Sequence, residues 1–307
     1  MKILLFGKNG QVGWELQRSL ASLGEVIALD FDSQADGVRA SSLCADFARP
    51  DELRRTVQNV SPDIIVNAAA HTAVDRAESE PEQARLINAR APAILAQEAV
   101  ALGAWLIHYS TDYVFDGSGS APRMETDPTG PLNVYGATKL EGERAILASN
   151  CHHLIFRTSW VYAARGGNFA KTMLRLGRER NSLTVIDDQT GAPTSAELLA
   201  DITAHAIAAT RLRTDLAGLY HLVAAGETSW YDYARFVLDF ARGRGIPLKV
   251  APEHILPVPS DAYPTPARRP HNSRLDTAKL QHAFHLRLPS WQSGVERMLT
   301  EVLEISS

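Results

Sequence analysis

The stretch that decides the fold is Ile3-Leu4-Leu5-Phe6-Gly7-Lys8-Asn9-Gly10-Gln11-Val12-Gly13. Its apolar run, Ile3 to Phe6, is typical of a strand buried on both faces of a parallel sheet, and a helix is predicted from about Gln11 to Leu23. Glycines between a strand and a helix allow a tight turn, close approach of a pyrophosphate and close helix packing. The stretch therefore predicts a dinucleotide-binding loop, with an ordinary glycine turn as the alternative.

Outward from this loop, strand and helix patterns alternate. Further strands are expected at Val26–Leu29, Ile64–Val66, Trp105–Tyr109 and Leu154–Phe156, and helices at about 80–102 and 132–148. The fold class is therefore α/β, with a Rossmann-type doubly wound parallel sheet over residues 1–160 together with about 196–222. A smaller, discontinuous α/β substrate-binding cap is expected from about 161–195 and 223–307. Its proline-rich stretch, Pro252 to Pro270, is expected to be largely loop.

Composition favours a cytoplasmic enzyme. The chain has 307 residues, is 45% hydrophobic and 21% charged, and has a formal net charge of -4, so no basic excess suggests nucleic acid as a partner. Cys44 and Cys151 belong to no metal-ligand spacing, which favours free thiols in a reducing compartment. No apolar run approaches the ~20 residues that span a bilayer, and Met1 to Gly7 is better explained as a first strand than as a secretory signal.

The candidate catalytic group is Tyr135-Gly136-Ala137-Thr138-Lys139, which follows Ser110-Thr111-Asp112. A tyrosine and a lysine at i and i+4 lie on one side of a helix, so the ammonium of Lys139 is expected to lower the pKa of Tyr135. A tyrosine tuned in this way is a proton donor for ketone reduction. Thr111 is expected to donate a hydrogen bond to the substrate oxygen, its alternative role being a turn cap.

Two acidic positions bear on the cofactor. Asp30 ends the second predicted strand, where an acid commonly holds the adenosine ribose, although it could simply cap a turn. Asp30 would repel a 2'-phosphate whereas Lys8 would attract one, so the choice between NADH and NADPH stays open. Asp46-Phe47 is expected to line the adenine pocket or to form a solvent-facing turn.

Together these motifs resemble a known family. The GxxGxxG spacing and the segments 67–70, 110–115, 135–139 and 157–162 are similar to extended short-chain dehydrogenases/reductases that act on nucleotide sugars. Within that family, the segments 71–75, 168–173, 188–194 and 268–273 bring the resemblance closest to enzymes that reduce the 4-keto group of dTDP-4-dehydro-L-rhamnose, the last step of dTDP-L-rhamnose synthesis.

The resemblance implies roles for particular residues. Tyr135 would donate the proton, Lys139 would tune it and bind the ribose, and Thr111 would orient the reacting oxygen. The cofactor, NADPH or NADH, would be bound by Gly7, Gly10, Gln11, Val12, Gly13, Asp30, Asp46, Phe47, Ala70, His71, Thr72, Tyr109, Tyr135 and Lys139. The nucleotide sugar would contact Thr111, Asp112, Trp160, Asn168, Arg268 and Arg269. A tryptophan after a strand is also common core filler, and solvated arginines are the default for that loop.

The resemblance further implies a homodimer with a structural Mg²⁺ ion at its interface, held by carboxylates at Glu15, Glu197 and Glu301. Three glutamates on separate helices are ordinarily solvated, and Mg²⁺ usually keeps several of its waters.

Two alternative functions stay open at this point. A nucleotide-sugar epimerase or 4,6-dehydratase of the same fold would keep NAD bound, but the Asp-Glu pair typical of such dehydratases is missing, since Tyr113 follows Asp112. A non-catalytic role is the other alternative, because the regulatory subunit of methionine adenosyltransferase resembles this family. The presence of Thr111, Tyr135 and Lys139 weighs against it.

Overall fold

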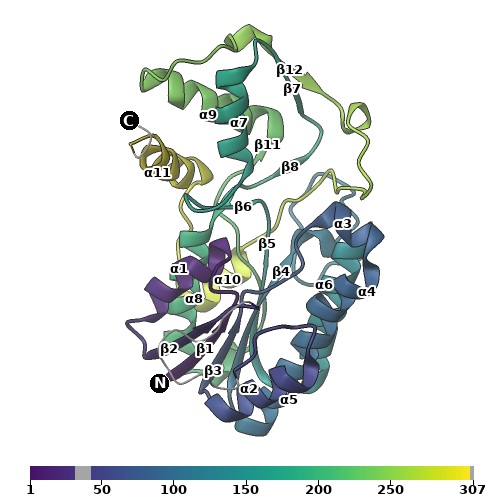
Figure 1. Ribbon diagram of the computed structural model, residues 1–307, viewed down its shortest axis with the longest axis vertical. Helices are drawn as coiled ribbons and strands as arrows, with labels where there is room; N and C mark the ends of the chain where they lie inside the picture. The colour runs from purple at the N-terminus through teal and green to yellow at the C-terminus, as the bar shows by residue number, and fades with distance from the viewer. Residues whose placement is uncertain (32–42, 305–307) are drawn as a thin grey trace.

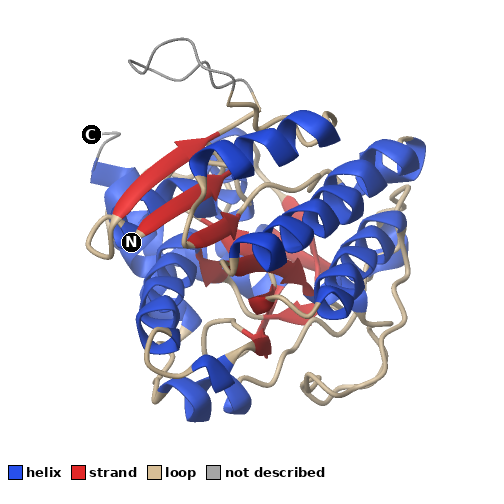
Figure 2. Cartoon of the chain, turned by 90° about the horizontal axis from the view of Figure 1, so that it is seen from below, coloured by secondary structure: helices blue, strands red, loops and turns tan. Residues whose placement is uncertain are grey.

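Parallel strands form the central sheet of the protein. Its structure is a computed structural model, which describes residues 1–31 and 43–304. The strand order is β10-β5-β4-β3-β1-β2. These strands are β1 (Lys2–Phe6), β2 (Glu25–Leu29), β3 (Ile64–Asn67), β4 (Trp105–Thr111), β5 (His152–Thr158) and β10 (Gly218–His221). The expected α/β class and parallel sheet are confirmed, and helices lie on both sides of the strands (Figures 1 and 2).

Side chains that alternate along β1 explain the two helical layers. Ile3 and Leu5 face one core and Leu4 and Phe6 face the other, and all four are fully buried. One core is shared with α1 (Gln11–Leu20), α8 (Ala196–Thr210) and α10 (Ala278–Phe284). The other is shared with α2 (Pro50–Val60), α5 (Ala91–Leu102) and α6 (Val134–Ser149).

The helix expected over 80–102 is interrupted. After α3 (Val74–Ser79), the chain runs through α4 (Pro81–Arg85), a π-helical turn η1 (Leu86–Arg90) and then α5. At this turn α6 packs closely, because a Cβ on Gly142 would lie 2.2 Å from the carbonyl oxygen of Asn88. The π turn also places the Asn88 side chain against His71, whose backbone N–H it accepts at 2.8 Å.

A second core lies beyond the carboxyl end of the sheet, at the top of Figure 1. It is built from α7 (Phe169–Glu179), α9 (Trp230–Gly243) and α11 (Trp291–Glu304). Within the proline-rich stretch, β12 (Ile255–Val258) pairs in parallel with β7 (Leu183–Ile186), so this stretch is not only loop. The remaining short elements are β6 (Val161–Tyr162), β8 (Thr190–Gly191), β9 (Thr194–Ser195), β11 (Thr228–Ser229), η2 (Asp112–Val114), η3 (Thr214–Leu216), η4 (Pro252–His254) and η5 (Ser260–Ala262).

Contacts between these cores bear on the expected domain ranges. β10 is a strand of the central sheet, and α8 packs against that sheet. α10 packs against the same core, although it falls within 223–307, the range expected for the cap. The exact domain boundaries stay a prediction. In the described part of the chain, no helix has the length and apolar character needed to cross a membrane.

The strand order indicates where a ligand is expected to bind. β2 lies on one side of β1, and β3 and the later strands lie on the other. The direction in which successive strands are added to the sheet therefore reverses at β1. In open α/β sheets, ligands bind beyond the carboxyl ends of the strands at such a switch point.

Candidate active site

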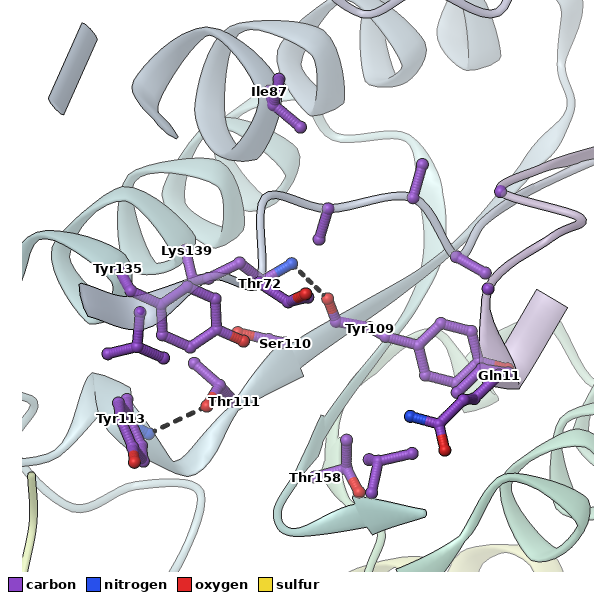
Figure 3. Close-up of a pocket in the computed structure, with 18 of the residues that line it drawn as sticks. Gln11, Thr72, Ile87, Tyr109, Ser110, Thr111, Tyr113, Tyr135, Lys139 and Thr158 are labelled. Carbon is purple, nitrogen blue, oxygen red and sulfur yellow. Dashed lines mark hydrogen bonds between the residues drawn. The ribbon is translucent and has the colours of Figure 1, made fainter. Parts of the chain in front are cut away.

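A cavity of about 990 Å³ opens at this switch point and reaches from the glycine loop to Trp160. Residues of the sheet layer form most of its wall, and Trp230 of α9 contributes from the second core. The predicted residues that line it are Gly7, Gly10, Gln11, Val12, Asp30, Asp46, Phe47, Ala70, Thr72, Tyr109, Thr111, Asp112, Tyr135, Lys139 and Trp160. Figure 3 shows several of these side chains directed into one space.

The glycine loop leaves no room for side chains. Gly7 has φ +87°, and a Cβ there would lie 2.7 Å from the backbone nitrogen of Ala69. A Cβ on Gly13 would lie 1.9 Å from the carbonyl oxygen of Gly7, so Gly13 brings α1 against the loop instead of lining the cavity. Gly10 precedes α1 without a side-chain cap, and Gln11 and Val12 line the cavity. Uncapped amides at a helix start favour bound phosphate.

The acidic end of the cavity is built from β2 and the loop before α2. Asp30 accepts a hydrogen bond from the backbone N–H of Asn9 at 2.9 Å, so it ties β2 to the glycine loop. Phe47 is buried and packs edge-on against Phe6, with ring centroids 5.5 Å apart. Asp46 and Phe47 therefore form a wall of the cavity, and the solvent-facing turn considered as the alternative does not describe Phe47.

The start of α6 positions Tyr135 and Lys139, the predicted catalytic pair. The side chain of Asn133 accepts a hydrogen bond from the Gly136 N–H at 2.8 Å and caps the helix. A Cβ on Gly136 would lie 2.2 Å from the carbonyl oxygen of Tyr113, so the first turn of α6 lies directly against η2. Tyr135 and Lys139 follow on the same side of the helix. The ring of Tyr135 lies beside Thr111 at the end of β4, and the side chain of Lys139 reaches toward Tyr109 (Figure 3).

Burial is the largest influence on the pKa values of Tyr135 and Lys139. Burial raises the pKa of Tyr135 to about 12, opposed by a hydrogen bond with Thr111. Burial also lowers the pKa of Lys139 to about 8, opposed by the charge of Glu143. Burial therefore dominates both groups and disfavours both charged forms, and the predicted influence of Lys139 on the pKa of Tyr135 stays a prediction. Tyr135 keeps its proton over the physiological pH range.

Lys139 is held from the sheet side. Its Nζ donates to the carbonyl oxygen of Tyr109 at 2.5 Å and lies 3.2 Å from Nε2 of His108. The hydroxyl of Tyr109 lies 2.6 Å from Oγ1 of Thr203, so this tyrosine is fixed at both ends. The lysine is thus positioned rigidly beside the cavity.

Thr111 and Asp112 form a buried pair next to Tyr135. Thr111 Oγ1 donates to Asp112 Oδ1 at 3.0 Å and accepts from the N–H of Tyr113 at 3.1 Å. In this arrangement the hydroxyl proton of Thr111 points to Asp112, so donation to a substrate oxygen requires the hydroxyl to rotate. Burial raises the pKa of Asp112 to about 6, opposed by hydrogen bonds from Ser273 and Thr111.

Trp160 forms the far wall. Its backbone has φ +49°, a conformation that residues other than glycine rarely adopt and that is concentrated at functional sites. Its indole is stacked on that of Trp230, which begins α9 after the N-cap Ser229. The sequence analysis did not assign Trp230 to the site. Trp230 falls within the cap expected over 223–307, but its sequence neighbours do not reveal that its ring stacks on Trp160.

Several predicted binding residues lie outside the lining of this cavity. Arg269 forms an ion pair with Asp75, with Nη2 and Nη1 donating at 2.7 and 3.1 Å. Arg268 is exposed, and its carbonyl oxygen accepts from Asn133 at 2.7 Å. Asn168 caps α7 by accepting from the N–H of Lys171 at 3.0 Å. Together with His71, these residues stay predicted ligand contacts.

The three predicted metal ligands lie on α1, α8 and α11, away from the cavity lining. Nε of Arg297 lies 3.1 Å from Glu197 and 3.5 Å from Glu301. Glu15 lies 3.6 Å from Arg18. Across residues 1–31 and 43–304, no group of three or more His, Cys, Asp or Glu side chains is arranged to hold a metal ion.

Comparison with known proteins covers nearly the whole chain. The model of the RmlD substrate binding domain family matches residues 1–304. The dTDP-4-dehydrorhamnose reductase of Escherichia coli (strain K12) is 62% identical over 302 residues, which are 98% of each chain. A crystal structure of a dTDP-4-dehydrorhamnose reductase from Clostridium acetobutylicum ATCC 824 has a TM-score of 0.86 and 34% identity, covering 99% of this chain and 100% of that one. The corresponding structure from Bacillus anthracis str. Ames, in complex with NADP, has a TM-score of 0.84 and 33% identity, covering 98% and 99%.

Proposed function

We propose that this chain, which belongs to the RmlD substrate binding domain family of dTDP-4-dehydrorhamnose reductases, reduces the 4-keto group of dTDP-4-dehydro-L-rhamnose to give dTDP-L-rhamnose. The reductant is NADPH or NADH, and the reaction is the last step of dTDP-L-rhamnose biosynthesis. One observation carries the proposal: Tyr135, Lys139 and Thr111 line a single cavity that has the glycine loop at one end and Trp160 at the other.

The residues at the glycine end fit a dinucleotide. The cradle formed by Gly7 and Gly13 has no space for a Cβ, and the uncapped start of α1 offers backbone amides to a pyrophosphate. Asp30, Asp46 and Phe47 would bind the adenosine, and Tyr109 and Lys139 the nicotinamide riboside. When bound, the reduced nicotinamide supplies the hydride.

The protein supplies the proton and the orientation. As hydride reaches the ketone carbon, the carbonyl oxygen gains charge and takes the phenolic proton of Tyr135. Tyr135 carries this proton at neutral pH, because its pKa lies far above 7. Thr111, freed from Asp112 by rotation of its hydroxyl, stabilises the same oxygen.

The substrate is expected to extend from Tyr135 toward the second core. Trp160 and Asp112 line the cavity there and would contact the sugar. Arg268, Arg269 and Asn168 are the candidates for the diphosphate. Arg269 would first have to exchange its pair with Asp75 for the phosphate oxygens. Arg268 has an exposed side chain.

The test is a direct assay. Purified protein is supplied with dTDP-4-dehydro-L-rhamnose and either cofactor, loss of reduced-nicotinamide absorbance is followed, and the product sugar is identified by chromatography. We expect one dTDP-L-rhamnose per cofactor oxidised. No consumption with either cofactor would refute the assignment, and NAD that stays bound through purification would favour an epimerase or dehydratase.

Two finer points belong to the same proposal. The preference between NADPH and NADH is measured as the ratio of the two kcat/KM values. The Bacillus anthracis structure is described in complex with NADP, which makes NADPH one of the two cofactors to compare. Cytoplasmic location is proposed on the composition and the two free cysteines.

A homodimer with interfacial Mg²⁺ is also proposed. Glu197 and Glu301 are paired with Arg297 in a single chain, so an ion would need carboxylates from a second copy. Light scattering before and after exhaustive chelation decides this. An unchanged dimer mass would remove the metal from the assembly, and a monomer in both conditions would remove the dimer as well.

A further inference from the structure

Gln189 is a buried polar residue that contacts the indole of Trp230. It lies between β7 and β8, and β8 pairs antiparallel with β11, with Thr190 opposite Ser229. The residue before β8 is therefore brought beside the residue that begins α9. Gln189 is 5% exposed, and its Oε1 accepts a hydrogen bond from Nε1 of Trp230 at 3.2 Å. Its Nε2 donates to Oγ of Ser260 at 2.9 Å, so both ends of the amide are satisfied.

The partner of this amide, Ser260, is itself held by a carboxylate. In η5, the N–H of Ser260 donates to Oδ2 of Asp188 at 2.9 Å and its hydroxyl donates to Oδ1 at 2.5 Å. Burial raises the pKa of Asp188, but these hydrogen bonds and the nearby His271 outweigh burial and hold that pKa below its usual value. Asp188 is therefore ionised at neutral pH and can only accept.

The ionised carboxylate fixes the direction of the whole line. The Ser260 hydroxyl has one hydrogen, which it gives to Asp188, so its oxygen can only accept from Gln189. The amide group that faces Ser260 is therefore the nitrogen. At the other end, the indole N–H of Trp230 can only donate, so the amide group that faces it is the oxygen. One orientation of the Gln189 amide satisfies both neighbours.

This hydrogen bond constrains the Trp230 indole in a way that packing does not. The ring lies 3.6 Å from that of Trp160 and 4.6 Å from that of Phe169, centroid to centroid. Dispersion contacts of this kind are non-directional, so they leave the indole free to slide or turn within its plane. A hydrogen bond weakens steeply when its donor turns away from the acceptor, so Gln189 fixes the rotation of the ring.

The same short segment also supports Trp160. A Cβ on Gly191, two residues after Gln189, would lie 2.9 Å from Cε2 of that indole. Both indoles line the cavity, whereas Gln189 is not among the residues that line it. A change at Gln189 can therefore reach a ligand only through its neighbours, and Trp230 is the neighbour that the amide binds.

We propose that Gln189 is a positioning residue for nucleotide-sugar binding, which acts through Trp230. Its amide, oriented by Ser260, fixes the Trp230 indole against Trp160 and so sets the shape of the cavity wall at which the sugar binds. The effect on the sugar rests on the proposed reductase function, but the hydrogen bond to Trp230 does not.

The hydrogen bond is tested without substrate or cofactor. Protein labelled with ¹⁵N-tryptophan gives one indole signal for each of its five tryptophans, and Trp230→Phe and Trp291→Phe identify two of them. Nε1 of Trp291 is buried and has no hydrogen-bond partner in the part of the chain that the structure describes, so its signal is the internal reference. We expect Gln189→Met to shift the Trp230 N–H signal upfield and to leave that of Trp291 in place. A Trp230 signal that stays in place in the folded variant would overturn the proposal.

Two further measurements cover a variant that does not fold. Gln189→Leu removes the same amide and makes the same test. In the wild-type protein, the N–H of Trp230 should exchange with solvent deuterium at least about tenfold more slowly than that of Trp14, which is 46% exposed. Equal exchange rates would overturn the proposal.

Steady-state kinetics separate positioning from a general structural role. Gln189→Met is expected to raise KM for the nucleotide sugar about three- to fivefold, the loss of one buried hydrogen bond. Both kcat and the dissociation constant for NADPH should change less than about twofold. An equal loss of cofactor affinity, or an unchanged KM, would contradict the proposed role.

The double variant shows whether Gln189 acts through Trp230. Trp230→Phe has no indole N–H, so adding Gln189→Met to it should change KM by less than about twofold. A further three- to fivefold rise would show that Gln189 does not act through the indole. If no reductase activity is found, the proposed function fails separately. The dissociation constant for dTDP-L-rhamnose, measured by calorimetry, then replaces KM in the same set of variants, with the same outcomes expected.

Discussion

The indole rings of Trp160 and Trp230 are stacked, with centroids 3.6 Å apart and planes inclined by 14°. Trp160 follows β5 of the sheet and Trp230 begins α9 of the second core. Each is supported from behind. A Cβ on Gly191 would lie 2.9 Å from Cε2 of Trp160, and Nε1 of Trp230 donates to Gln189 at 3.2 Å. The stack therefore joins the two cores at the end of the cavity marked by Trp160, where the sugar is proposed to bind.

This stack predicts a selective effect on the nucleotide sugar. Trp230→Ala is expected to raise KM for the nucleotide sugar about tenfold, the loss of an aromatic contact worth about 1 to 1.5 kcal/mol, with the dissociation constant for NADPH changed less than about twofold. Trp230→Phe keeps an aromatic face and should show a smaller increase. Steady-state kinetics and fluorescence titration with cofactor measure both, and an equal loss of cofactor affinity would contradict this location.

Removal of the phenolic proton should stop chemistry and spare binding. Tyr135→Phe is expected to lower kcat by about 10² to 10⁴, the usual value for a general acid, with cofactor affinity unchanged within about twofold. Tyr113→Phe is the matched control, since its ring packs edge-on against Tyr135 at 5.7 Å. It should lower kcat by less than about tenfold. Full turnover by Tyr135→Phe would exclude the mechanism.

Asp112 should lower stability at neutral pH. Its folded pKa of about 6 exceeds the ordinary 3.8, so between these values the folded state binds more protons than the unfolded state. The free energy of unfolding therefore falls as pH rises through this window, and the loss is complete above about pH 6. At about 1.4 kcal/mol per unit, the ceiling is about 3 kcal/mol.

Asp112→Asn removes this charge. Its free energy of unfolding at pH 7 is expected to exceed that of wild type by on the order of 2 kcal/mol, because the amide is neutral but keeps only part of the hydrogen bonding. The gain should disappear near pH 4. Urea unfolding across this range is the measurement, and a gain independent of pH would rule out the titration of Asp112 as its source.

Alanine substitutions at two glycines distinguish a glycine that close packing requires from one that lies in open space. Gly13→Ala would place its methyl group 1.9 Å from the carbonyl oxygen of Gly7 and is expected to cost at least about 3 kcal/mol and to abolish cofactor binding. Gly167→Ala meets no atom within 4 Å and should change stability by less than about 0.5 kcal/mol. Thermal unfolding and NADPH titration of both variants make the comparison. Normal cofactor affinity in Gly13→Ala would show that α1 can move away from the loop.

Local sequence determined much of this protein. The apolar run from Ile3 to Phe6 and the glycines after it specify a buried strand, a tight turn and a close helix, because these depend on hydrophobic periodicity and on backbone space. The spacing of Tyr135 and Lys139 placed both on one side of α6 for the same local reason. The resemblance of the motifs to nucleotide-sugar reductases then indicated the substrate.

Tertiary structure alone decided the electrostatics and the long-range contacts. The pKa values of Tyr135 and Lys139 follow from burial under the second core and against β4, which no spacing reveals. The stack of Trp160 on Trp230 and the hydrogen-bond line from Ser260 through Gln189 to Trp230 join residues far apart in the chain. Hydrogen-bond direction and desolvation depend on which groups meet in space, so only the folded chain determines them.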